Sequence, residues 1–281
     1  MIEPDLSLSD ATFERLRERI QVEAGIALAG SKRSLVVARL GRVVRRLQLD
    51  SFEAYLDYLD SRASAADQQD FVNALTTNLT RFFREAHHFE HLVEHVRDLI
   101  ATRPNIKRLR IWSAGCSTGQ EPYSIGLSLL DELPELAHWD FRILATDIDT
   151  TVLAKAATGV YPVSELTGLS PRRLEMVERM GDGRARMPRA VMSRITFKPL
   201  NLLSHWPMKG PFDAIFCRNV TIYFDRATQA TVFRRFGEML ATDGMLYVGH
   251  SENMRAAETG MRIVGRTVYQ RAEKRKARSA A

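Results

Sequence analysis

Apolar residues in the first hundred positions recur every three or four residues, which is the spacing of amphipathic helices. Phe13, Leu16 and Ile20 follow this spacing after a capping Ser9, and Gly25 stops the segment. We therefore predict that this region contains helices only. Four further helices are expected over 31–47, around 52–59, over 66–79, and from about Glu85 to just before Pro104.

After Pro104 the pattern changes to strands that alternate with helices, which predicts an α/β fold with a largely parallel sheet. The expected strands are 109–112, 141–146, 194–198, 212–217 and 244–249, and an antiparallel pair, 261–264 and 266–271, closes the sheet. Helices are expected at about 121–132, 150–157 and 226–240. Residues 159–193 are too long for a plain crossover, so they are interpreted as an inserted helix with a small excursion.

Composition narrows the class of protein. The 281 residues are 45% hydrophobic, enough for an ordinary core, and only two cysteines are present, Cys116 and Cys217. This favours a reducing compartment over a disulfide framework. The acidic N-terminus lacks the apolar core of a secretory signal, and no run is long enough to cross a bilayer. We expect a soluble, cytoplasmic protein.

Basic side chains outnumber acidic ones by 40 to 34, and their distribution is uneven. Between Ser31 and Leu49 there are six basic residues and no acidic one. Helical spacing places Arg39, Arg42 and Arg46 on one face, with Arg45 adjoining. Such a face is commonly just solvated, but one of a single sign also steers an acidic partner. A second basic cluster begins at Arg271 in the C-terminal tail.

The loop 113–119 lies between a predicted strand and a predicted helix. Gly115 and Gly119 let the backbone approach a ligand closely, and the helix start offers free N–H groups. Strand, glycine loop and helix are typical of nucleotide- or nucleoside-binding domains, although such a loop is also ordinary turn chemistry. The G-x-x-x-G spacing differs from the dinucleotide motif G-x-G-x-x-G, which disfavours a nicotinamide-dependent oxidoreductase.

Polar residues follow three further predicted strands. Asp147 ends the second strand, where an acidic residue accepts hydrogen bonds from ribose hydroxyls; alternatively, Asp147 or Asp149 caps the next helix. Asn201 and the pair Arg218 and Asn219 follow later strands, and each asparagine alone could be a turn residue. Because the carboxyl ends of parallel strands open onto one crevice, we expect these residues to converge there.

Three other features have two interpretations each. The segment TTNLTRFFRE, residues 76–85, interrupts the helical pattern, and it is either a capped helix junction or part of the site. His87, His91 and His95 lie on one helical face, but no carboxylate completes a metal site, so we predict no metal. Cys116 could be a nucleophile, yet no histidine is placed to activate it.

Several long segments, taken in order, resemble the bacterial chemoreceptor glutamate O-methyltransferases, the CheR family. They are NALTTNLTRFFREAHHF, IWSAGCSTGQEPYSIG, ATDIDTTVLAKA, FDAIFCRNVTIYFD and GHSENM, within a resemblance that runs from about residue 7 to 271. The resemblance implies an α-helical N-terminal receptor-recognition domain (1–85), a linking helix (86–103) and a Rossmann-like methyltransferase domain (104–272). It also implies an inserted antiparallel β-subdomain at about 159–193. Residues 273–281 are expected to be a disordered basic tail.

The resemblance further implies S-adenosylmethionine as methyl donor, S-adenosylhomocysteine as product and no metal. The implied cofactor-binding residues, joined by Gly115 of the glycine loop, are Asn78, Thr80, Arg84, Glu121, Asp147, Asn201, Leu202, Arg218 and Asn219. Arg84 and Tyr223 would lie beside the transferred methyl group as the catalytic pair. No general base is expected, because a glutamate carboxylate is already ionised near neutral pH.

The implied partner is the cytoplasmic helical region of methyl-accepting chemoreceptors, whose acidic character suits Arg39, Arg42, Arg45 and Arg46. Some family members also bind a receptor C-terminal peptide through the β-subdomain, and the sequence leaves this open, with 181–184 as the candidate loop. A nucleic-acid methyltransferase is the rival enzyme class, but residues 218–221 lack the prolines of an N-P-P-Y-like loop. A receptor-binding adaptor without activity is the non-enzymatic rival. Neither nucleic acid nor membrane insertion is expected.

Overall fold

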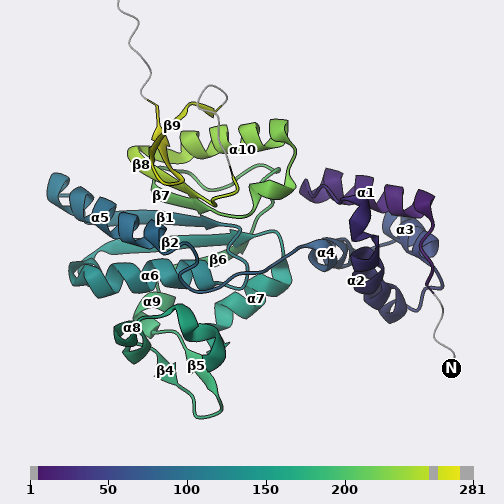
Figure 1. Ribbon diagram of the computed structural model, residues 1–281, viewed down its shortest axis with the longest axis horizontal. Helices are drawn as coiled ribbons and strands as arrows, with labels where there is room; N and C mark the ends of the chain where they lie inside the picture. Colours follow the sequence, from purple (N-terminus) through teal and green to yellow (C-terminus); the bar gives the residue numbers. More distant parts are fainter. Residues whose placement is uncertain (1–5, 253–258, 273–281) are drawn as a thin grey trace, which may run out of the picture.

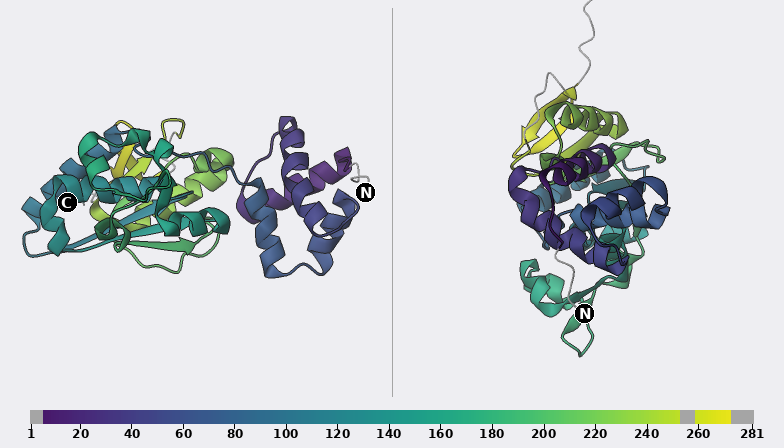
Figure 2. Two further views of the ribbon diagram at one scale, coloured as in Figure 1. Left: turned by 90° about the horizontal axis from the view of Figure 1, so that it is seen from below. Right: turned by 90° about the vertical axis from the view of Figure 1, so that its right-hand side faces the viewer.

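The computed structural model describes residues 6–252 and 259–272. A helical bundle built from residues 10–75 lies at one end of the molecule, and a sheet flanked by helices forms the rest (Figures 1 and 2). No helix within the described ranges is both long and apolar enough to cross a membrane. The tail 273–281 and the last two residues of the GHSENM segment lie outside the described residues.

The bundle contains the first four helices, α1 (Asp10–Ala24), α2 (Arg33–Arg46), α3 (Phe52–Ser61) and α4 (Ala65–Leu75), with a short 3-10 turn, η1 (Gly30–Lys32), before α2. Ser9 caps α1 and Gly25 ends it with a left-handed φ of 72°, both as predicted. The helix expected to reach residue 79 stops at Leu75, because Thr76 is extended, with ψ 154°. Residues 76–80 instead form an irregular segment that leads into the second part of the molecule.

The sheet has seven strands in the order β6-β2-β1-β7-β8-β10-β9. They are β1 (Arg108–Ala114), β2 (Asp140–Asp147), β6 (Ile195–Pro199), β7 (Phe212–Cys217), β8 (Leu240–Val248), β9 (Met261–Gly265) and β10 (Val268–Arg271). The first five are parallel, and β10 and β9 are antiparallel to their neighbours. All seven predicted strands are present, although β8 begins four residues earlier than expected.

Helices cover both faces of this sheet (Figure 1). On one face lie α5 (His87–Thr102), α6 (Gln120–Glu132) and α7 (Thr150–Thr158). A 3-10 turn, η2 (Pro134–His138), follows α6. On the other lies α10 (Arg226–Met239), preceded by η4 (Thr221–Tyr223). The apolar face of α5 packs on strands β7 and β8, where Phe89 stacks on Phe216 and His91 contacts Tyr247, so this helix contributes to the core of the sheet.

The insertion between β2 and β6 is a small antiparallel sheet of order β3-β5-β4. Its elements are β3 (Val160–Pro162), η3 (Val163–Gly168), α8 (Pro171–Glu175), β4 (Glu178–Arg179), β5 (Arg184–Arg186) and α9 (Arg189–Met192). Tyr161 and Ala185, which are paired across β3 and β5, are fully buried beneath it. The inserted antiparallel sheet that the family resemblance implies is therefore present, and the pattern-based expectation of a helix with a small excursion was incomplete.

Candidate functional site

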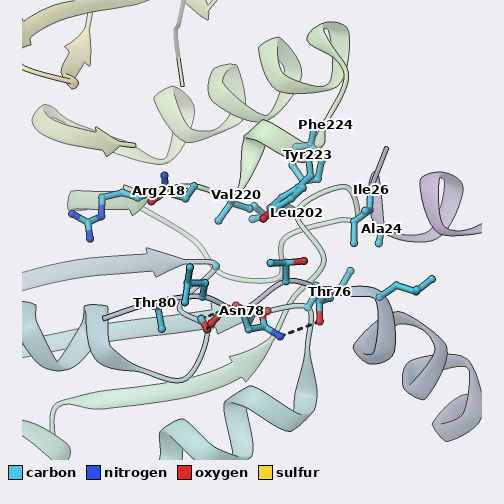
Figure 3. Close-up of a pocket in the computed structure, with 18 of the residues that line it drawn as sticks. Ala24, Ile26, Thr76, Asn78, Thr80, Leu202, Arg218, Val220, Tyr223 and Phe224 are labelled. Carbon is cyan, nitrogen blue, oxygen red and sulfur yellow. Dashed lines mark hydrogen bonds between the residues drawn. The ribbon is translucent and has the colours of Figure 1, made fainter. Parts of the chain in front are cut away.

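A cavity of about 300 Å³ lies between the helical bundle and the carboxyl ends of the parallel strands. Figure 3 shows that its walls come from the end of α1, the segment after α4, and the loops after β6 and β7. Every residue predicted to bind the cofactor or to act in catalysis lines it: Asn78, Thr80, Arg84, Gly115, Glu121, Asp147, Asn201, Leu202, Arg218, Asn219 and Tyr223. Residues far apart in the chain thus meet at one site.

The glycine loop forms the floor of the cavity next to β2. The N–H groups of Gly115 and Cys116 donate to the Thr146 carbonyl at 2.7 and 2.9 Å, which fixes the loop against the strand end. Gly115 has φ 82°, and a Cβ there would lie 2.3 Å from Cγ2 of Val220. A side chain at this position is therefore excluded both by conformation and by space.

Asp147 points its carboxylate into the cavity from the end of β2. Oδ2 accepts from the N–H of Ser117 at 2.7 Å, and Oδ1 accepts from the N–H of Asp149 at 3.0 Å. Burial raises the pKa of Asp147 to about 6, because hydrogen bonds from the neighbouring backbone N–H groups offset only part of the lost hydration. The capping alternative applies to the neighbour: Asp149 accepts from the N–H groups of Thr151 and Val152 and caps α7.

The segment after α4 is fastened to this same corner. Oδ2 of Asp149 accepts from Oγ1 of Thr76 and from Nδ2 of Asn78, both at 2.7 Å. Oγ of Ser117 donates to the Asn78 carbonyl at 2.9 Å. One buried aspartate therefore holds both the start of α7 and residues 76–78, which is more than the capped helix junction considered from the sequence.

Arg84 lies in a segment with unusual backbone geometry. Its neighbours Phe83 and Glu85 both have left-handed φ values, 53° and 56°, which are uncommon for residues other than glycine. The N–H of Phe83 donates to Oγ of Ser124 at 3.0 Å, and Nη1 of Arg84 donates to the Leu79 carbonyl at 3.1 Å. Arg84 lines the cavity, and its other guanidinium donors have no hydrogen-bond partner among the described residues.

Arg218, directly after β7, and Glu121, at the start of α6, form a buried ion pair. Nε of Arg218 donates to Oε2 of Glu121 at 2.7 Å, and Nη1 donates to the Arg84 carbonyl at 2.6 Å. Nη1 also lies 3.1 Å from Nδ1 of His88. Burial lowers the pKa of His88 to about 3, so the neutral ring can accept this hydrogen bond. Arg218 thereby ties the segment that carries Arg84 to the sheet.

Two contacts connect the bundle to the cavity walls. Nδ2 of Asn201 donates to the Glu23 carbonyl at 2.6 Å, and the N–H of Ala27 donates to the Tyr223 carbonyl at 3.0 Å. A Cβ on Gly25 would lie 2.8 Å from the Phe224 ring, so the backbone passes close to that ring. The end of α1 is thus part of the site, which the sequence alone did not suggest.

The four arginines predicted to bind substrate do not line the cavity. Arg39 donates to the carbonyls of Ala74 and Thr76, and Arg46 pairs with Asp70 of α4 at 2.5 Å. Arg42 and Arg45 are exposed and have no polar partner among the described residues. The purely basic face that the sequence predicted for α2 is therefore partly neutralised, because α4 brings the acidic residue Asp70 beside it.

The other candidate groups are occupied elsewhere. Nδ1 of His91 lies 3.1 Å from the Tyr247 hydroxyl, and Nε2 of His95 lies 3.3 Å from the Asp213 carbonyl, so these rings face the sheet. Within residues 6–252 and 259–272, no group of side chains could hold a metal ion. Burial raises the pKa of the Cys116 thiol well above its usual range, which disfavours a thiolate nucleophile.

Glu252 was not singled out from the sequence, yet it is buried in the turn after β8, beside the site. It accepts five hydrogen bonds, four of them from Asn219, Val220 and Thr221. The only signal in the sequence was an acidic residue shortly after a predicted strand, within the GHSENM segment. Nothing local marks that residue as a partner of a loop thirty positions earlier.

The fold and the residues that line the cavity indicate the class of protein. A carboxylate at the end of the second strand, a glycine loop and a cavity at the carboxyl edge suit a nucleoside-containing ligand. The additional carboxylate, amide and guanidinium groups suit the amino-acid part of S-adenosylmethionine, so the residues present fit this cofactor. These features are those of an S-adenosylmethionine-dependent methyltransferase.

Comparison with known proteins specifies the family. The model for the CheR methyltransferase SAM-binding domain matches residues 78–270, and that for the CheR all-alpha domain matches residues 11–76. The chain belongs to the CheR methyltransferase family. It is 46% identical to the chemotaxis protein methyltransferase of Salmonella typhimurium and 45% to that of Escherichia coli, each over 94% of this chain and 91–92% of the relative.

A further relative, chemotaxis protein methyltransferase 2 of Pseudomonas aeruginosa, is 44% identical over 92% of this chain and 91% of its own length. Among solved structures, PKMT2 from Rickettsia typhi in complex with AdoHcy matches with a TM-score of 0.32 and 15% identity. That match covers 50% of this chain and 21% of the other.

Proposed function

We propose that this enzyme transfers the methyl group of S-adenosylmethionine to glutamate side chains of methyl-accepting chemoreceptors, as part of adaptation in a chemosensory pathway. The products are glutamate methyl esters and S-adenosylhomocysteine. The single observation that supports this most strongly is the cavity, which is lined by the predicted cofactor residues and by Arg84 and Tyr223 together. The proposal agrees with membership of the CheR family.

The cofactor supplies an electrophilic methyl group on a sulfonium, and the protein has to align a carboxylate oxygen with it. We assign the holding of this carboxylate to the free donors of Arg84, because a guanidinium can present two parallel N–H groups. The Tyr223 hydroxyl would fix its orientation. Neither residue needs to exchange a proton, because the carboxylate is already anionic near neutral pH.

Arg84 is also assigned to the cofactor, together with the other predicted cofactor-binding residues. Asp147 would accept hydrogen bonds from the ribose hydroxyls, and Asn201 and Leu202 would contact the base. Asn78, Thr80, Gly115, Glu121, Arg218 and Asn219 would complete the cofactor pocket. Glu121 already shares its carboxylate with Arg218 and Ser113, so we assign it mainly to the polar end of the ligand.

Receptor recognition is assigned to α2. Arg42 and Arg45 project into solvent with no polar partner among the described residues, so they are available to an acidic helix in the cytoplasmic region of a receptor. Arg39 and Arg46 are the weaker candidates, because each already has a partner. We keep a receptor C-terminal peptide at the β-subdomain as an open part of the proposal, at loop 181–184.

We also propose that the chain divides functionally as its family does. Residues 1–85 would form the receptor-recognition domain, 86–103 the linking helix and 104–272 the methyltransferase domain. The packing of α5 onto the sheet suggests that the linking helix moves with the methyltransferase domain.

The test is transfer of labelled methyl from S-adenosylmethionine to purified cytoplasmic receptor fragments. We expect label that is released by mild base, as an ester is, and that is absent from fragments in which the accepting glutamates are replaced by alanine. Fragments with and without their C-terminal ends would test the peptide. Label in RNA or DNA but not in receptor would support the nucleic-acid methyltransferase instead, and cofactor binding without any transfer would support an adaptor.

A further inference from the structure

The loop after β7 converges on a single buried carboxylate. Oε1 of Glu252 accepts from the N–H of Val220 at 3.0 Å and from the N–H and hydroxyl of Thr221, both at 2.7 Å. Oε2 accepts from the N–H groups of Asn219 and Gly249, both at 2.7 Å. Glu252 is 3% exposed, so water does not compete for these contacts.

The loop needs an acceptor of this kind. Asn219 has a left-handed φ of 60°, and the turn aims three consecutive backbone N–H groups to the same side, where no strand or helix can pair with them. Each of these groups would cost about 1–3 kcal/mol if buried without a partner. A carboxylate, which is purely an acceptor, satisfies all three at once.

Gly249 completes the arrangement from the end of β8. A Cβ there would lie 2.7 Å from Nδ2 of Asn219 and 2.9 Å from Oε2 of Glu252, so the strand end and the loop are in direct contact. The loop held in this way begins at Arg218 and runs through η4 to Tyr223. It therefore carries two proposed cofactor residues and one proposed catalytic residue.

We propose that Glu252 is a positioning residue of the methyltransferase: it fixes the backbone of residues 219–221 and thereby sets the places of Asn219 and Tyr223 in the cavity. Glu252 itself does not line the cavity. The inference rests on the proposed function, because the roles of Asn219 and Tyr223 are part of that proposal.

Glu252→Gln tests the idea with little change of shape. An amide has one acceptor oxygen, and its NH₂ group would face either the three donors at Oε1 or the two at Oε2. We expect amide hydrogen exchange at residues 219–221 to become roughly 10- to 100-fold faster. We also expect the Kd for S-adenosylhomocysteine, measured by calorimetry, to rise about tenfold or more, and kcat on receptor to fall.

Asp213→Asn is the matched control. Asp213 is a buried carboxylate at the opposite end of β7, where it accepts from the N–H of Arg110 and from Arg103 at 2.9 Å each. Its replacement should lower Tm while leaving the exchange of residues 219–221 and the Kd unchanged. The contrary result is a similar loss of Tm in Glu252→Gln while the exchange of residues 219–221 and the Kd for S-adenosylhomocysteine both stay within about twofold of the wild type. In that case Glu252 is a structural residue only and the proposal is overturned.

Thr221 gives a second route if Glu252→Gln does not fold. Thr221→Val removes one donor from Oε1 and keeps the shape, whereas Thr221→Ser keeps the hydroxyl. We expect the valine variant to show the same changes to a smaller degree and the serine variant to match the wild type; equal behaviour of the two would count against the proposal. Failure of the wild type to bind S-adenosylhomocysteine or to methylate receptor would instead contradict the proposed function.

Discussion

Arg84 enters the cavity from a backbone that is strained on both sides, at Phe83 and Glu85. Such geometry costs about 1–3 kcal/mol per residue and persists only where its surroundings enforce it. Here the Arg218 side chain holds the Arg84 carbonyl and Ser124 holds the Phe83 N–H. The backbone at Arg84 is therefore held from two elements, the end of β7 and α6, and the guanidinium is held by the Leu79 carbonyl.

Replacement of Arg84 by alanine should lower kcat/KM on receptor by about 100-fold, because the carboxylate loses a charged, bidentate partner. Cofactor affinity should fall as well, since Arg84 is assigned to both ligands. Arg81→Ala is the control, because Arg81 lies in the same segment but is exposed and outside the cavity. Full turnover together with unchanged cofactor affinity in the Arg84 variant would refute the assignment.

Cofactor binding should weaken in mild acid because of Asp147. Its pKa of about 6 in the free enzyme means that the carboxylate needed by the ribose is protonated below that pH. A ligand that binds only the ionised form lowers this pKa, so Kd should rise as pH falls, by up to tenfold per unit below 6. Calorimetry with S-adenosylhomocysteine between pH 5 and 8 measures this.

Asp147→Asn should bind weakly at every pH, because the amide cannot replace the carboxylate as a double acceptor. A wild-type Kd that stays constant from pH 5 to 8 would show that Asp147 does not contact the ligand in its ionised form.

At the scale of elements, one residue at the start of α7 stabilises two parts of the chain. Asp149 caps the helix and also binds Thr76 and Asn78 of the segment after α4. A capping residue usually serves one helix, so loss of this one should affect two elements.

Asp149→Ala should therefore reduce stability by about 1–2 kcal/mol through the lost cap and also loosen residues 76–78. We expect the Kd for S-adenosylhomocysteine to rise severalfold, measured beside the free energy of unfolding. Asp225→Ala is the matched control, because Asp225 caps α10 without holding a second segment. If both variants lose stability and neither changes the Kd, the segment after α4 does not depend on Asp149.

The elements were largely predictable from the sequence, and the contacts between them were not. The alternation of strand-like segments with helical ones located the strands, and the rule for parallel sheets placed Asp147, Asn201 and Arg218 at one edge. The α4 boundary was missed, because Thr76 is extended by its bond to Asp149, a partner 73 residues away. Glu252 was missed for the same reason: four of its five donors come from residues 219–221, which become its neighbours only when β8 pairs with β7.

At the scale of the whole molecule, the bundle and the sheet domain are joined by polar contacts at two corners of the cavity. On one side Gln69 and Asn73 of α4 contact Ile148, Thr150 and Thr151. On the other side the end of α1 contacts Asn201 and Tyr223. Arg42 and Arg45 lie on the outer surface of this bundle.

Receptor binding should weaken as salt rises, because the screening length falls from about 10 Å at 0.1 M to about 3 Å at 1 M. The double variant Arg42→Ala/Arg45→Ala should lose affinity at low salt and lose most of the salt dependence. Arg46→Ala is the control and should change less, since Asp70 already pairs with Arg46. Receptor affinity that is independent of salt in the wild type would contradict an electrostatic role for α2.

The hydrogen bond from Ala27 to the Tyr223 carbonyl has a consequence for engineering. A chimera that takes its helical bundle from another family member also imports part of the wall around the methyl donor. Exchange of receptor preference by grafting residues 6–75 should therefore alter the kinetic constants for the donor at the same time. Grafts that keep Glu23 to Ala29 from the recipient would separate the two properties.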